Sequence, residues 1–331
     1  MASIAHVGYG YWGRNLARNF SELGVLDTIV DPDPDAAAAA AATLGAKAAA
    51  FEDVLSDPHI DGISIASPAE MHFGHAMAAL KAGKHVYVEK PLALDVAEAE
   101  SLHETALRSG LTLMVGHLLQ YHPVYVKLRA MVEDGEFGRL LYVYSNRMSL
   151  GKFRREENVL WSFAPHDISM LLGLFGSEPS HVSAQGTVSH TPGIADMVTV
   201  QMHFPGGGSG HIQVCWMHPF KEQRLVVIGE KAMAVFEDSE PDWNAKLKLY
   251  RHEIDTSGPV PMPQKTDPEL VAVPRSEPLR NECMHFCACI DQRQKPLTDG
   301  IEGLGVLRAL QKAELALREN LEHQQEQKDV R

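Results

Sequence analysis

Residues 4–16 read IAHVGYGYWGRNL, and this segment indicates how the first part of the chain folds. An apolar run at Ile4–Val7 predicts a buried strand, and the spacing over residues 14–23 predicts a helix. Between the two, three glycines form a GxGxxG pattern: Gly8, Gly10 and Gly13. The first permits a tight turn, the second lets a pyrophosphate approach the backbone, and the third lets helix and strand pack closely. This pattern predicts a dinucleotide site with Tyr11 and Trp12 beside the ligand; a glycine-rich turn that binds nothing is the alternative.

The alternation of strands and helices continues to about residue 120. Apolar runs predict further strands over residues 25–30, 60–66, 85–88 and 111–115. The alanine run at 36–42 predicts a helix, because alanine is the best helix former. Strands joined through helices form a parallel sheet that is covered on both faces. Residues 1–120 are therefore expected to be a doubly wound Rossmann domain of the α/β class.

The pattern changes after Tyr121. Six alternating runs predict longer strands, over residues 140–144, 181–188, 197–204, 210–216, 224–228 and 232–236. The remaining segments predict a helix near 124–132, a hairpin turn at 205–210, a proline-rich loop at 258–278, helices near 278–291 and 302–320, and about six frayed residues at the end. Residues 121–331 are therefore expected to form a substrate-binding α+β domain on a large, mostly antiparallel open sheet. Helix 302–320 is free to pack back on the first domain. An open sheet invites pairing between copies, so a homodimer or homotetramer is expected.

Composition excludes several classes of protein. The 331 residues include 30 basic and 43 acidic side chains, and the net charge of −13 argues against a nucleic acid or an anionic membrane as partner. Hydrophobic residues make up 45% of the chain, as in ordinary globular proteins, and no apolar run is long enough to span a membrane. No secretory signal is visible at the start, and four cysteines make no disulfide scaffold. A cytoplasmic two-domain protein is expected.

Asp31 supports a nicotinamide dinucleotide as ligand. It ends the second predicted strand at about the expected distance after the last glycine of the pattern. A carboxylate there can accept both hydroxyls of the adenosine ribose and would repel a 2′-phosphate. Asp33 and Asp35 add to that repulsion and no arginine adjoins them, so NAD is favoured over NADP; a plain turn residue before Pro32 is the alternative.

Glu89, Lys90 and Pro91 directly follow the predicted strand at residues 85–88. Ligands of doubly wound sheets bind beyond the carboxyl ends of the strands, so Lys90 is expected to reach the nicotinamide side of the site. Partial desolvation or a nearby positive nicotinamide would bring its pKa toward the range of proton transfer. Taken alone, the tripeptide also fits an ordinary surface loop.

Together these motifs resemble the glucose–fructose oxidoreductase / inositol dehydrogenase (Gfo/Idh/MocA) family, and the layout of the second domain agrees with it over essentially the whole chain. The resemblance implies that Lys90 is catalytic and orients the substrate. It also implies that Ser67, Pro68 and His72 lie along the cofactor. No metal is expected: Cys283, Cys287 and Cys289 with His285 fit an apolar helix better than a zinc site.

The family also carries an Asp-xxx-His pattern on a helix that ends in Leu-x-Gly. Here 174–176 provides that ending, and the histidine falls at His166. Imidazole is well suited to accept a hydroxyl proton near neutral pH, and a buried structural histidine is the alternative. Ser162 stands where the family has its aspartate, and Asp167 follows the histidine instead, which leaves open which carboxylate assists His166.

Within the family, residues 158–169, 10–16 and 216–221 resemble the nucleotide-sugar 3-dehydrogenase branch. The resemblance implies NAD-dependent oxidation of the C3 hydroxyl of a UDP-sugar in the cleft between the domains, with His166, or Lys90 with it, removing the hydroxyl proton. UDP-N-acetylglucosamine is favoured over its uronate. A pyridoxal-phosphate aminotransferase would then convert the ketone into a 3-amino sugar for lipid A or another surface polysaccharide.

Several side chains are candidate substrate contacts, and each also fits an ordinary structural or surface role. A basic group in this acidic protein would suit a diphosphate, because arginine matches phosphate oxygens bidentately: Arg147, Lys152, Arg154, Arg155 and Lys221. The further candidates are His117, Asn158, Trp161 and Asp167. Two other functions stay open: an inositol or free-sugar dehydrogenase of the same family, and an NAD-binding sensor without turnover.

Overall fold

The computed structural model describes residues 1–151 and 153–329, which fall into two compact units. The first unit combines Met1–Tyr121 with Ser276–Leu307. The second holds His122–Arg275 and the chain from Arg308 onward. The chain therefore returns to the first unit late, at residues 276–307, a segment that the sequence assigned to the second domain. Lys152, one of the basic candidates, lies outside the described residues.

The first unit is built on a six-stranded sheet with the order β3-β2-β1-β4-β5-β6, and every neighbouring pair is parallel. Its strands are β1 (Ile4–Val7), β2 (Leu26–Val30), β3 (Lys47–Ala48), β4 (Gly62–Ile65), β5 (His85–Glu89) and β6 (Leu113–Gly116). The order reverses direction between β1 and β4, which is the point where doubly wound sheets bind ligands. The predicted Rossmann fold is confirmed; β3 is too short to show in the sequence pattern.

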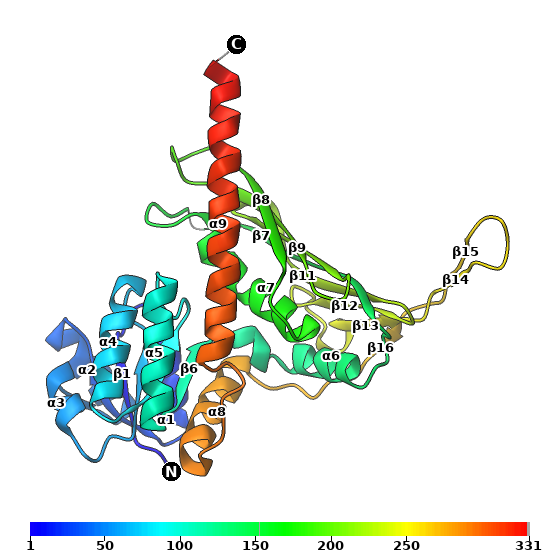
Figure 1. Cartoon of the computed structure of the whole chain (residues 1–331). Coiled ribbons are helices and arrows are strands. Elements are labelled where there is room, and N and C mark those ends of the chain that lie inside the picture. The colour runs from blue at the N-terminus through cyan, green and yellow to red at the C-terminus, as the bar shows by residue number, and fades with distance from the viewer. Residues whose placement is uncertain (152, 330–331) are drawn as a thin grey trace. The chain divides into compact units, whose positions relative to one another are not determined.

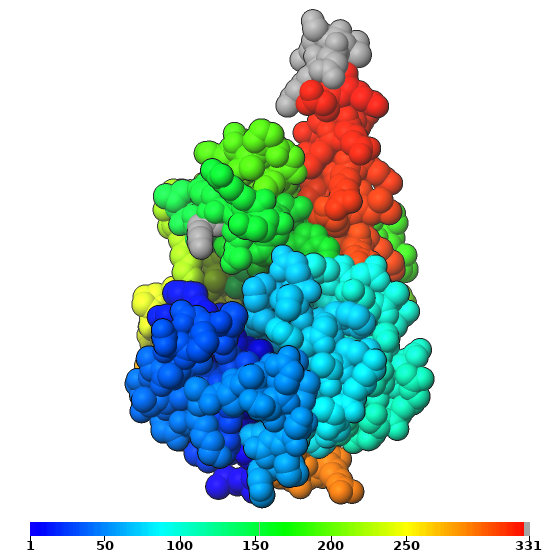
Figure 2. All heavy atoms as spheres, turned by 90° about the vertical axis from the view of Figure 1, so that its left-hand side faces the viewer, coloured from blue at the N-terminus to red at the C-terminus, as the bar shows by residue number. Residues whose placement is uncertain are grey.

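Helices cover this sheet (Figure 1). They are α1 (Gly13–Glu22), α2 (Pro34–Leu44), α3 (Phe51–Ser56), α4 (Ala69–Lys81), α5 (Val96–Ser109), α8 (Pro278–Gln292) and the beginning of α9 (Gly300–Asp329). The Asp33 carboxylate caps α2 and the Asp95 carboxylate caps α5 by accepting backbone N–H groups of the first turn. α4 packs beside α5, and the atoms of α2 to α5 (blue to cyan) form the near surface of this unit in Figure 2.

Aromatic packing explains why α8 belongs to the first unit. Phe286 on α8 meets Phe20 on α1 and Tyr87 on β5 edge to face, with ring centroids 6.4 Å and 5.9 Å away. All three side chains are fully buried. Such edge-to-face pairs add to the stabilisation from burial itself. Helix α8 therefore completes the core above β5 and β6, a contact between residues about 200 positions apart that no local pattern predicts.

The second unit is built on an eight-stranded sheet with the order β16-β13-β12-β11-β7-β10-β9-β8. Its strands are β7 (Leu140–Leu150), β8 (His181–Thr187), β9 (Met197–His203), β10 (Ser209–Cys215), β11 (Met217–Gly229), β12 (Met233–Glu237), β13 (Leu247–Tyr250) and β16 (Glu269–Leu270). Within the described residues of this sheet, β7 and β10 alone pair in parallel, so the predicted mostly antiparallel sheet is confirmed. β7 and β11 run longer than the sequence indicated, because polar residues continue both strands.

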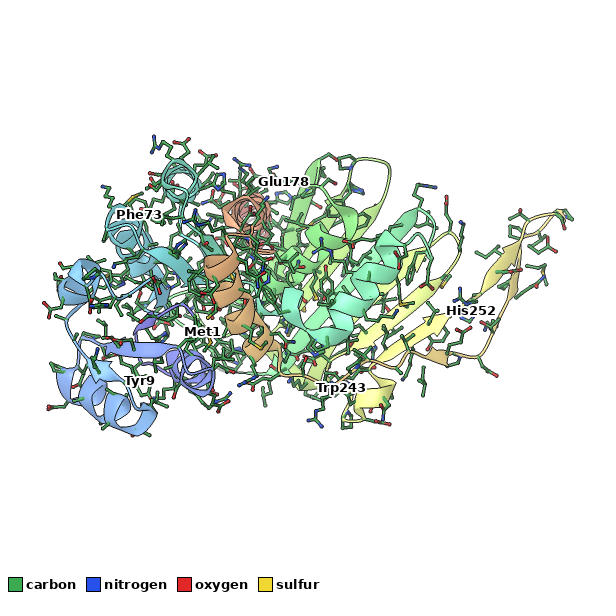
Figure 3. The ribbon with its side chains drawn as sticks, turned by 90° about the horizontal axis from the view of Figure 1, so that it is seen from below. Met1, Tyr9, Phe73, Glu178, Trp243 and His252 are labelled. Carbon is green, nitrogen blue, oxygen red and sulfur yellow. The ribbon has the colours of Figure 1, made fainter. Side chains whose placement is uncertain are left out.

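Two helices pack against this sheet, α6 (Pro123–Glu133) and α7 (Val159–Phe175). The proline-rich loop was predicted without structure, but it contains β15 (Met262–Gln264) and the edge strand β16. β15 pairs with β14 (Glu253–Asp255) in a hairpin that extends away from the sheet (Figures 1 and 3). The polar C-terminal residues that were expected to fray continue α9 as far as Asp329. Of the described helices, none has the length and apolar character needed to cross a membrane.

Candidate active site

The glycine-rich turn after β1 has the shape that a dinucleotide requires. Gly8 has a φ of +94°, and a Cβ there would lie 2.7 Å from the Ala66 carbonyl oxygen. A Cβ on Gly13 would lie 1.9 Å from the Gly8 carbonyl oxygen, so the start of α1 packs directly on the turn. A Cβ on Gly10 would meet no atom within 4 Å, so the backbone is open on that side. The turn therefore fits a pyrophosphate at the N-terminus of α1.

Asp31 is held against this turn at the end of β2. Its carboxylate accepts the Tyr9 N–H at 2.7 Å and the Asp33 N–H at 3.0 Å. Figure 3 labels Tyr9, on the loop that follows β1. Arg14, which the sequence prediction left aside, lies over the Tyr9 ring at 5.5 Å, so a guanidinium does adjoin this loop. The position of the Asp31 carboxylate suits the adenosine ribose hydroxyls of NAD.

His72 clamps two loops together within the first unit. Its ring is buried, with Nδ1 at 2.7 Å from the Pro91 carbonyl oxygen and Nε2 at 2.8 Å from the Ser67 carbonyl oxygen. Burial lowers the pKa of His72. Both ring nitrogens face protein carbonyls, so His72 joins residues 67–68 to the segment after β5, and its place along the cofactor stays a prediction. The Ser67 hydroxyl lies 3.0 Å from Nδ1 of His75.

Glu89 anchors the segment that carries Lys90. The buried Glu89 carboxylate accepts the Trp12 indole N–H at 2.5 Å, the Tyr87 hydroxyl at 3.1 Å and the Lys90 backbone N–H at 3.2 Å. Burial raises the pKa of Glu89, while the Trp12 hydrogen bond and the Lys90 charge act in the opposite direction. Lys90 is half-buried at the carboxyl end of β5, and its peptide bond to Pro91 is cis. Tyr11, by contrast, is 92% exposed.

A second group of candidates surrounds α7 in the second unit. Arg147, Ser162 and His166 line a cavity of about 210 Å³ together with Met148, Ser149, Phe163 and Gln223. Both Ser162 and His166 face this cavity because they lie four positions apart on α7, which is about one helical turn. The cavity therefore joins the predicted base to hydroxyl, amide and guanidinium groups.

Within the described residues, the Asp167 side chain is hydrogen-bonded to residues of β7 and not to His166. Its carboxylate accepts the Arg147 Nε–H at 2.7 Å, a second Arg147 N–H at 3.2 Å and the Ser145 hydroxyl at 2.6 Å. The Asp167 side chain is 1% exposed and that of Arg147 is 11% exposed. The sequence left open which carboxylate assists His166. The hydrogen bonds of Asp167 go to Ser145 and Arg147 on β7, which argues against Asp167 in that role.

Other predicted contacts have structural partners. The Asn158 side chain caps α7 through the Leu160 and Trp161 N–H groups, and both Asn158 Nδ2 and Trp161 Nε1 donate to Glu314 on α9. His117 is buried in the first unit with Nδ1 at 2.6 Å from the Glu302 carboxylate.

The remaining basic candidates lie on the surface of the second unit. The four cysteines, all within the described residues, are free thiols and form no disulfide. Arg154 is exposed and pairs with Glu157 at 2.9 Å; Arg155 and Lys221 are also exposed. Burial raises the pKa of Cys287 to about 12 and that of Cys289 to about 11. Among residues 1–151 and 153–329, no group of three or more His, Cys, Asp or Glu side chains is arranged to hold a metal ion.

Comparison with known proteins agrees with this geometry. Residues 2–117 match the model of the oxidoreductase family with an NAD-binding Rossmann fold, and residues 125–235 match the Gfo/Idh/MocA C-terminal domain. The chain belongs to the Gfo/Idh/MocA oxidoreductase family. Like the dehydrogenases of this family, it is an NAD-dependent enzyme that acts on CH–OH groups.

Two curated relatives show the range of the family. A UDP-N-acetylglucosamine 3-dehydrogenase of Acidithiobacillus ferrooxidans is 28% identical over 312 residues, covering 94% of this chain and 96% of the relative. Its solved structure superimposes with a TM-score of 0.85 at 26% identity, covering 96% of this chain and 98% of the other. A myo-inositol 2-dehydrogenase of Thermotoga maritima is 26% identical over 71% of this chain and 75% of its own length.

Proposed function

We propose that this enzyme oxidises the C3 hydroxyl of UDP-N-acetylglucosamine to the 3-keto sugar. The observation that carries the proposal is the chemistry of the His166 cavity, which is lined by hydroxyl, amide and aromatic groups and by one arginine that is already paired with Asp167. A polar lining without net charge suits an uncharged sugar ring. The similarity to a UDP-N-acetylglucosamine 3-dehydrogenase over 94% of the chain supports the same substrate.

The roles in this proposal follow from the two sets of residues. Bound NAD supplies the acceptor for the hydride that leaves C3. His166, or Lys90 with it, takes the proton of the 3-hydroxyl group, because imidazole exchanges protons near neutral pH. Gly8, Gly10, Gly13 and Asp31 hold the dinucleotide, and the Lys90 ammonium orients the reacting hydroxyl. Alignment of the hydride donor and acceptor contributes a large share of the rate.

The same cavity argues against the uronate as the preferred substrate. A sugar carboxylate that is desolvated on binding needs a cationic partner, since an unpaired buried charge costs free energy. Among the described residues that line the cavity, Arg147 is the one fully charged side chain, and its guanidinium already makes two hydrogen bonds to Asp167. The neutral acetamido sugar needs no such partner.

The test is NADH formation, followed by absorbance, with UDP-N-acetylglucosamine, its uronate and myo-inositol in parallel. Because oxidation of an alcohol by NAD is unfavourable, a pyridoxal-phosphate aminotransferase with an amino donor is added to remove the ketone. We expect turnover with the neutral UDP-sugar and its loss in Lys90→Met, with NAD affinity retained. Turnover with myo-inositol alone would refute the proposal, and tight NAD binding without turnover on any substrate would favour a sensor.

An inositol dehydrogenase is the second candidate function, because an uncharged polar cavity also suits an inositol ring and one relative is a myo-inositol 2-dehydrogenase. If the UDP-sugar is the substrate, the reaction that consumes the product is an amination, which would supply a 3-amino sugar for lipid A or another surface polysaccharide. We also propose that copies pair through the open face of the eight-stranded sheet, as a homodimer or homotetramer.

A further inference from the structure

Three carboxyl groups gather in the first unit behind the segment that carries Lys90. Glu89 lies on β5, Glu282 on α8 and Glu302 at the start of α9. Glu282 is 0% exposed and Glu89 is 8% exposed, and the side chain of Glu302 is 18% exposed. Both Tyr87 and Tyr121 adjoin the same cluster. Ionised carboxylates in so buried a place repel one another, which favours protonation within the cluster.

Glu282 is the member whose surroundings most favour the neutral form. Neither of its carboxyl oxygens makes a hydrogen bond within the described residues, and no cation pairs with it there. Burial raises the pKa of Glu282 well above its usual range, and the charges of Glu89 and Glu302 raise it further. Glu302 differs because its carboxylate lies 2.6 Å from Nδ1 of His117. These surroundings therefore favour the neutral, protonated form of Glu282.

Glu89 has the partners that a charged carboxylate needs. The Trp12 indole and the Tyr87 hydroxyl both donate to Oε1, and the Lys90 backbone N–H donates to Oε2. Gly116, opposite Glu89 on β6, makes room for this arrangement, since a Cβ there would lie 2.8 Å from the Tyr87 hydroxyl and 3.0 Å from the Glu89 carboxyl. Hydrogen bonds to the charged form of a carboxyl favour that form.

We propose that Trp12 is a positioning residue for Lys90 and acts through Glu89. Its indole N–H keeps the Glu89 carboxylate charged and fixed against the backbone of Lys90. Because Trp12 belongs to the glycine-rich turn, the same bond joins the dinucleotide loop to the reactive lysine. This inference rests on the role of Lys90 in the proposed function.

The positioning role of Trp12 predicts how the pH dependence of kcat changes when its indole N–H is removed. Without the indole N–H, burial dominates and Glu89 takes up a proton at a higher pH. A hydrogen bond to a charged group corresponds to about one pH unit. In Trp12→Phe we therefore expect the acid limb of kcat to move about one unit toward neutral pH. Tyr87→Phe removes the longer bond, so we expect a smaller shift in the same direction.

A substrate-free measurement tests the bond itself. The chain has four tryptophans, so ¹⁵N-indole labelling gives four N–H signals, and Trp12→Phe assigns one of them. We expect the Trp12 signal to titrate with Glu89, to lose this titration in Glu89→Gln, and to keep its midpoint in Glu282→Gln because the surroundings of Glu282 already favour its neutral form. A Trp12 signal unaffected by Glu89→Gln, or a titration that vanishes in Glu282→Gln, would overturn the inference.

Trp243→Phe is the matched control for the kinetics. Trp243 also donates its indole N–H, at 2.7 Å to the Val273 carbonyl oxygen, but it belongs to the second unit, whereas Glu89 belongs to the first. We expect the acid limb of kcat in Trp243→Phe to match that of the unsubstituted enzyme. An unchanged acid limb and kcat in Trp12→Phe would overturn the positioning role. Full activity of Lys90→Met would instead refute the proposed function, so the two failures are distinguishable.

Discussion

Replacement of Asp167 by asparagine should change the substrate preference of the enzyme. The Asp167 carboxylate neutralises Arg147 through hydrogen bonds of 2.7 Å and 3.2 Å in a buried setting. Asparagine keeps the shape and an acceptor for Ser145 but removes the negative charge. Arg147 then brings an uncompensated positive charge to the His166 cavity. We expect the uronate of UDP-N-acetylglucosamine to gain relative to the neutral sugar.

The size of the effect follows from the charges involved. Two unit charges about 4 Å apart interact with about 4 kcal/mol at the effective dielectric constant of a protein surface. A sugar carboxylate that enters an open cavity gains only part of this, and we take about 1.4 kcal/mol, or a factor of about ten. The ratio of kcat/KM for the uronate to kcat/KM for the neutral sugar should therefore rise about tenfold in Asp167→Asn.

The assay is NADH formation with both nucleotide sugars at low concentration, with circular dichroism to confirm that the variant folds. Glu230→Gln is the control, because it removes the carboxylate that pairs with Arg139 at 3.0 Å on the surface of the same unit. The ratio should not change in that variant. An unchanged ratio in a folded Asp167→Asn enzyme would show that the Arg147 charge does not act on the substrate.

Three further predictions concern the first unit. Gly10→Ala should keep the fold but weaken NAD binding, as measured by calorimetry. Gly13→Ala should unfold the turn, because its Cβ would lie 1.9 Å from the Gly8 carbonyl oxygen. Equal stability of the two variants would contradict this prediction. Asp31→Ala should weaken NAD binding and narrow the preference over NADP, and unchanged affinity would remove Asp31 from the ribose site. Burial lowers the pKa of His6 from 6.5 to about 4, so the unfolded chain binds a proton that the folded chain refuses, and stability should fall by about 3 kcal/mol as the pH drops from 6.5 to 4. Urea unfolding of His6→Asn should lack this part of the pH dependence, and an identical dependence would refute it.

Local rules explain how much of the fold could be predicted. The turn at residues 8–13 needs glycine for reasons of backbone geometry, and the apolar runs of the first 120 residues report burial on both faces of a parallel sheet. Strand ends and two-residue strands such as β3 were missed because a period of two residues cannot be read from so short a segment. The mostly antiparallel second sheet followed from alternation, while the polar extensions of β7 and β11 carry no such signal.

The same distinction applies to the candidate site: some of its residues could be predicted from the sequence, but their contacts could not. The glycine-rich turn, the aspartate at the end of β2 and the lysine after β5 could be predicted from the residue order, because each lies at a fixed offset from a strand end. The groups that these side chains contact become known from the folded chain. Asp167 pairs with Arg147, twenty positions away, Trp12 reaches Glu89 over 77 positions, and α8 brings Glu282 into the same core. Such contacts depend on how distant elements pack, and packing leaves no periodic trace in the order of residues.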